Sequence, residues 1–203
     1  MTKNLLVATL FILIVNLAFA QRFDGGAIVG FNASQVEGDI YKGYHKPGAV
    51  AGFYVETDIA PAVFAAFEIK FSQKGARKKV STKDPEKYIM RLDYIDLPVY
   101  LAFRTNDRGS ILAGLSTGFL IGAKEFDNYG EFQLEDQNAF NTIDLEPFIG
   151  FQFDFLENLK ADLRMGLSVL PIRGKPGVNT NSYWLNSQFN NVITLALYYQ
   201  ISR

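Results

Sequence analysis

A strict alternation of apolar and polar residues constrains this chain more than any other feature. It is clearest in "LKADLRMGLSVLPI" (159–172), where every second residue from Leu159 to Val169 is apolar and Lys160, Asp162 and Arg164 lie between them. A period of two residues is typical of a β-strand whose faces meet different surroundings. The open question is which face meets water.

The same pattern recurs along the chain and predicts an all-β fold. Eight strands are predicted near 23–33, 47–57, 62–73, 90–103, 110–123, 142–155, 159–170 and 190–202. The long loops 34–46, 74–89, 124–141 and 171–189 alternate with short turns near 58–61, 105–109 and 157–158. In an antiparallel up-and-down meander, this puts all long loops at one end and both chain ends at the other, as in bacterial outer-membrane barrels.

The apolar face of the strands is bulky and uncharged. Phe67, Leu163 and Phe151 are typical of it, and its apolar runs, which start at Ile95 in the fourth strand, contain no charged residue. An eight-stranded barrel has an interior just wide enough for side chains to fill it, so this many Phe, Leu and Ile side chains would overfill it. We therefore predict an eight-stranded antiparallel up-and-down transmembrane β-barrel that turns its apolar face to lipid. The alternative is a soluble periplasmic, lipocalin-like binder with the apolar face inside.

The opposite face combines small and charged residues. Eight strand glycines have this parity: Gly26, Gly30, Gly52, Gly114, Gly118, Gly122, Gly150 and Gly166. The charge network predicted for the lumen consists of Glu56, Glu68, Lys70, Asp96, Glu146, Asp162 and Arg164. Buried charges need partners, and Lys74, Arg91 and Lys124 near the rims are candidates. A paired network would plug the barrel, whereas a hydrated one would form a narrow ion path; the small barrel favours the plug.

The N-terminus predicts export. "MTKNLLVATLFILIVNLAFAQ" has Lys3, an apolar run and a closing Ala18-Phe19-Ala20, which is typical of a secretory signal peptide. We expect a signal peptide over 1–20 and an outer-membrane barrel domain over 21–203. No other segment is apolar for the roughly 20 residues that a membrane-spanning helix needs.

Composition and spacing argue against several function classes. The net charge of −1 gives no support for a nucleic-acid partner, and without cysteine there are no disulfides or thiolate metal sites. No His cluster, Ca²⁺-loop pattern or phosphate-binding glycine motif is present, so neither metal nor cofactor is expected. His45 is the only histidine. It leaves open a membrane-embedded lipid-modifying enzyme, which would need Ser34, Ser72 or Ser110 beside it.

Three of the long loops have distinct chemistry. Loop 74–89 is basic, with an external basic group at Arg77, Lys78 and Lys79 that would suit anionic lipopolysaccharide. Loop 124–141 is acidic and could attract it. Loop 171–189 carries Tyr183, Trp184 and Phe189, which predict an interfacial aromatic girdle or a partner surface.

Several segments resemble the PorT-like outer-membrane β-barrel family. They are "VGFNASQVEGD" with "KPGAVAGFYVE", then "FEIKFSQKGARKK", "YIDLPVYLAF" and "GLSTGFLIGAK". The resemblance implies an eight-stranded outer-membrane barrel, in a family whose founding member is linked to protein secretion and gliding. The chain departs from the usual aromatic end of such barrels, because it closes with "YYQISR".

The leading hypothesis is a non-enzymatic protein of the bacterial outer membrane. Its external loops would stabilise the envelope or contact an envelope protein, and its partners would be outer-membrane lipid and lipopolysaccharide.

Overall fold

The computed structural model describes most of the chain outside its N-terminal segment. The described residues are 22–39, 41, 43–80, 82, 85–132, 139–174 and 187–202. The predicted signal peptide and the aromatic residues Tyr183 and Trp184 lie outside them, so these predictions are not addressed by the structure. None of the described residues belongs to a helix long and apolar enough to cross a bilayer.

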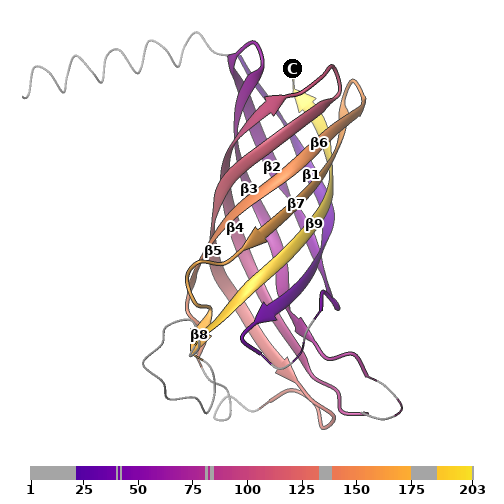
Figure 1. Cartoon of the computed structure of the whole chain (residues 1–203), viewed down its shortest axis with the longest axis vertical. Coiled ribbons are helices and arrows are strands. Elements are labelled where there is room, and N and C mark those ends of the chain that lie inside the picture. Colours follow the sequence, from indigo (N-terminus) through magenta and orange to yellow (C-terminus); the bar gives the residue numbers. More distant parts are fainter. Residues whose placement is uncertain are drawn as a thin grey trace, which may run out of the picture.

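Eight long strands close into one antiparallel barrel, which confirms the predicted fold class (Figure 1). They are β1 (Phe23–Glu37), β2 (Lys46–Ala60), β3 (Val63–Arg77), β4 (Ile89–Arg104), β5 (Gly109–Phe126), β6 (Ile143–Leu156), β7 (Leu159–Leu167) and β9 (Ser187–Ser202). Each pairs with the next along the chain, and β1 pairs with β9 to close the sheet. A two-residue strand, β8 (Arg173–Gly174), pairs with the first two residues of β9. We call the two ends of the barrel the long-loop end and the short-turn end.

Most strands run further than predicted at the long-loop end. β1, for example, continues to Glu37 and β3 to Arg77. The alternation signal fades there because outward positions such as Gln35 become polar once the strand leaves the apolar band. β7 is shorter than predicted and ends at Leu167. Pro171 follows closely and has no N–H with which to continue a ladder.

The side chains point as the alternation predicts, with most strand glycines and the predicted charge network facing the lumen and the bulky apolar residues facing outward. Phe67, Phe151 and Leu163 point outward and are 42%, 43% and 50% exposed, whereas Glu68 and Asp162 are fully buried. The large apolar side chains therefore form an outer band of the kind that faces lipid in membrane barrels. The soluble alternative, which needs this face inside, is wrong.

Strand glycines make room inside the barrel. At Gly114, on β5, an added Cβ would lie 2.4 Å from the Tyr100 Cβ and 2.9 Å from the Phe148 Cζ. The two rings pack edge to face, with centroids 6.0 Å apart. Gly114 thus lets two large lumen side chains meet beside the wall.

We expect Gly114→Val to lower the free energy of unfolding by about 1–3 kcal/mol, because overpacking must displace these rings. Urea unfolding in lipid vesicles measures it. The control is Ala113→Val, whose side chain points outward and should change stability little. Equal losses in the two variants would contradict a filled lumen.

Candidate functional site

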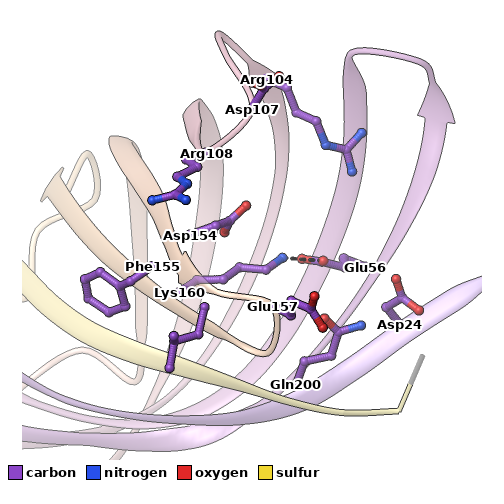
Figure 2. Close-up of a pocket in the computed structure, with 11 residues that line it drawn as sticks. Asp24, Glu56, Arg104, Asp107, Arg108, Asp154, Phe155, Glu157, Lys160 and Gln200 are labelled. Atoms are coloured by element: carbon purple, nitrogen blue, oxygen red, sulfur yellow. Dashed lines mark hydrogen bonds and ion pairs between the residues drawn. The ribbon is translucent and has the colours of Figure 1, made fainter.

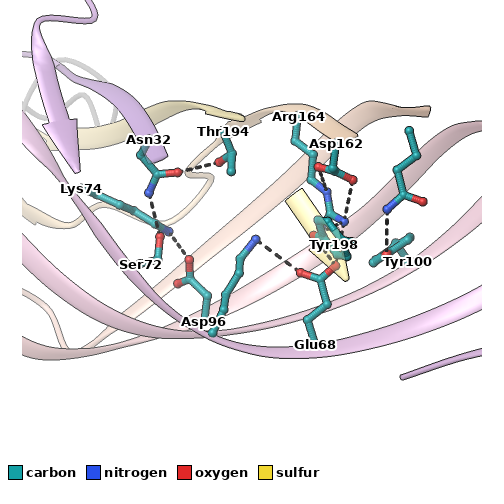
Figure 3. A network of polar contacts seen from close by, with 12 residues as sticks. Asn32, Glu68, Ser72, Lys74, Asp96, Tyr100, Asp162, Arg164, Thr194 and Tyr198 are labelled. Carbon is teal, nitrogen blue, oxygen red and sulfur yellow. Dashed lines mark hydrogen bonds and ion pairs between the residues drawn. The ribbon is translucent and has the colours of Figure 1, made fainter. Parts of the chain in front are cut away.

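Arg164 is the centre of the first charged layer in the lumen (Figure 3). Its guanidinium group lies 2.7 Å from Glu68 and 2.8 Å from Asp162, and it donates a 2.8 Å hydrogen bond to the Tyr198 hydroxyl. Tyr198 donates in turn to Glu68, and Lys70 lies 3.4 Å from the other Glu68 oxygen. Two cations therefore balance two carboxylates in this layer.

Lys74 holds a second layer nearer the long-loop end. Its Nζ lies 3.2 Å from Asp96, 3.6 Å from Asp144 and 3.1 Å from Glu146. Asn190 donates a 2.9 Å hydrogen bond to Asp144. Between the two layers lies a cavity of only about 10 Å³, which is room for about one water molecule. The middle of the barrel is thus occluded by side chains.

A wider polar vestibule opens at the short-turn end (Figure 2). Its volume is about 520 Å³, and it combines carboxylates such as Asp24 and Asp154 with the cations Arg104 and Arg108. Its inner side is closed by the Lys160–Glu56 ion pair. The vestibule therefore ends at a charge pair and does not continue into a pore.

A third cluster closes the lumen at the long-loop end. Arg173, on β8, makes a two-pronged contact with Glu125, at 2.7 and 2.8 Å, and bonds to Gln188 on β9. Tyr88 also bonds to Glu125. Burial, and then this hydrogen bond, raise the pKa of Tyr88 well above its usual range, so the hydroxyl keeps its proton and remains a donor. We call these residues the loop-end cap.

All seven residues of the predicted charge network lie in the lumen. Glu68, Lys70, Asp162 and Arg164 share one layer, Asp96 and Glu146 belong to the next, and Glu56 is at the inner side of the vestibule. Of the candidate rim partners, only Lys74 reaches them. Arg91 pairs with Asp93 and Lys124 with Glu131, both on exposed positions. These two cations were therefore assigned wrongly.

The external basic group does not act as a unit. Lys78 pairs with Glu86, Lys79 is exposed, and Arg77 lies at the outward end of β3. Contacts between the basic and acidic loops do exist, but they run through the Lys87 backbone N–H, which donates to Asn128, and through Tyr88. Phe189 is buried at the start of β9, so it belongs to neither an aromatic girdle nor an exposed surface.

The described residues do not place a serine beside His45. His45 is exposed, and its backbone N–H bonds to Gly43. The Ser34 hydroxyl donates to the Gly75 carbonyl, Ser72 accepts a bond from Asn32, and Ser110 lies near the short-turn end. No group of three or more metal-binding side chains occurs in this part of the chain.

Sequence reasoning missed some members of these clusters. The alternation places Tyr198 in a strand but gives no sign that its hydroxyl joins Arg164 to Glu68. Arg173 and Gln188 fall in a predicted loop, and nothing in the local sequence links Arg173 to Glu125, 48 residues away. One signal could have identified Tyr198 as a lumen residue: in the pairing of β7 with β9, it faces the same side of the wall as Arg164.

Comparisons with known proteins agree with this architecture. The family model described as "Outer membrane protein beta-barrel domain" matches residues 19–172. Ail, the attachment invasion locus protein of Yersinia pestis, solved with the heparin analogue sucrose octasulfate, is 17% identical, with a TM-score of 0.51 over 89% of this chain and 99% of that one. Neisserial surface protein A is 11% identical, with a TM-score of 0.52 over 88% and 97%. No curated protein sequence matches the chain.

At these identities, the two solved structures support the fold alone. The family match covers most of the chain, including seven of the eight barrel strands. The outward apolar band is what such a protein requires. This chain belongs to the outer membrane protein beta-barrel domain family, and its place is the bacterial outer membrane.

Proposed function

We propose that this protein is a closed, non-enzymatic barrel that works through its long-loop end, which faces the cell exterior. The observation that carries the proposal is the series of paired charges across the lumen, from the loop-end cap to the Lys160–Glu56 pair. A barrel filled in this way offers no path for solutes. Its remaining working surface is the rim and the loops, which would stabilise the envelope or contact a partner.

Two points support the outward orientation. Long loops face outside and short turns face the periplasm in outer-membrane barrels. The basic residues at the end of β3, in the loop that follows and at the start of β4 lie at the long-loop end, where anionic lipopolysaccharide would meet them. We place the chain among the PorT-like barrels on the five segments quoted above, and association with a secretion apparatus through the external rim is part of this proposal.

We expect the purified protein to show no stepwise ion conductance in planar bilayers at neutral pH. The Arg173→Ala variant removes the loop-end cap and should stay closed, because the Lys74 and Arg164 layers remain. A large porin in the same bilayers is the positive control. Stable unitary conductance from the unmodified protein would contradict the proposal, and conductance only in Arg173→Ala would assign the closure to the cap alone.

A further inference from the structure

A pocket of about 380 Å³ lies on the outer wall at the long-loop end. It is lined by four cationic residues, Lys46, Arg77, Lys87 and Arg91, and by three apolar ones, Pro47, Ile89 and Phe126. They come from β2, β3, the loop before β4, β4 and the end of β5. The volume is within the roughly 300–1,000 Å³ typical of small-molecule sites.

The positive charge of this pocket is only partly neutralised by the described residues, because its lining contains four cations and no carboxylate. Asp93 pairs with Arg91 at 3.3 Å and accepts a hydrogen bond from Gln73. The ammonium of Lys46 bonds to the Pro47 carbonyl; Arg91 and Arg77 repel it, and Asp93 attracts it. Like charges held together in this way are stabilised by an anion.

The wall below the pocket is apolar. The β4 register runs from Arg91 through Asp93 to Ile95, and Ile95 pairs with Phe71 on one side and Phe119 on the other. This row of three apolar side chains lies about 13 Å from Arg91, at ~3.3 Å per residue of strand. An occupant of the pocket therefore meets cations at one end and a lipid-facing surface at the other.

We propose that this pocket binds the phosphate groups of a phosphorylated glycolipid of the lipid A type, with its acyl chains lying on the Phe71–Ile95–Phe119 row. Arginine suits this role because its planar guanidinium group bonds to phosphate oxygens in pairs. The site differs from the basic group predicted from the sequence: it uses Arg77, but replaces Lys78 and Lys79 with Lys46, Lys87 and Arg91. The inference rests on the orientation proposed above.

The test is native mass spectrometry of the detergent-solubilised full chain with bisphosphorylated lipid A, dephosphorylated lipid A and sodium pyrophosphate. We expect Arg77→Gln/Arg91→Gln to weaken lipid A binding tenfold or more, and dephosphorylation to have a similar effect. The matched control is Lys79→Gln/Arg108→Gln, which removes the same charge away from the pocket and should change binding by less than twofold.

Each other outcome overturns the proposal. Equal losses in the two double variants would mean diffuse electrostatic attraction, and equal binding of dephosphorylated lipid A would remove the role of phosphate. Full displacement by pyrophosphate at the concentration of lipid A would make the pocket a site for a free anion or for an anionic protein partner. Conductance is measured separately, so a failure here is distinguishable from a failure of the closed-barrel proposal.

Discussion

Arg164→Met is expected to lower the free energy of unfolding by about 3–5 kcal/mol, the cost of leaving a buried charge without its partner. Arg164 is 4% exposed and is the shared partner of Glu68, Asp162 and Tyr198. It also stacks on the Tyr100 ring, with its guanidinium carbon 4.4 Å from the centroid. Methionine fills part of the volume but leaves two carboxylates with Lys70 as their only cation. Urea unfolding in lipid vesicles measures the loss.

A second variant separates charge from packing. Arg164→Met/Asp162→Asn removes one cation and one anion, so that Glu68 keeps Lys70 and Tyr198 as partners. We expect this double variant to recover most of the stability lost in Arg164→Met. Lys124→Met is the control for an exposed pair and should cost no more than about 1 kcal/mol. A loss of that size in Arg164→Met would mean a hydrated lumen and would count against the closed barrel.

The sequence carried enough information for the barrel and its sidedness, because both follow from a local period of two. Phe67 and Glu68 are neighbours in the chain and lie on opposite sides of the wall, and parity alone assigns them. The strand ends were harder to predict, since β1 and β3 continue beyond the apolar band, where outward residues turn polar and alternation disappears.

The charge partners could be predicted only in part. Parity places Lys74 and Glu146 in the lumen, but their contact joins residues 72 positions apart and depends on the stagger of the strands around the barrel. Arg91 shows the converse: its position near a rim suggested a lumen partner, whereas its odd parity on β4 turns it outward to Asp93. The residues that line the outer-wall pocket come from four strands and from the loop before β4, so no single segment of the sequence predicts it.

The sidedness itself has a direct thermodynamic consequence at Leu163. This side chain is 50% exposed, and its neighbours on the adjacent strands are Phe151 on β6 and Leu195 on β9. At an exposed position in water, Leu→Arg is usually close to neutral. In the middle of a bilayer, an outward arginine costs about 2–4 kcal/mol. We therefore expect Leu163→Arg to lower the free energy of unfolding in lipid vesicles by that amount.

The matched control for Leu163→Arg is Phe155→Arg, at the same outward parity but beside the β6–β7 turn. Phe155 is 43% exposed, and arginine near the interface costs only about 0–1 kcal/mol because its charge reaches the headgroups. The difference in stability between the two variants thus reports the depth of each position in the membrane. Packing and burial within the protein would not produce such a difference between two outward positions. If both variants were as stable as the unmodified barrel, the apolar band would not face hydrocarbon, which would contradict its placement in the membrane.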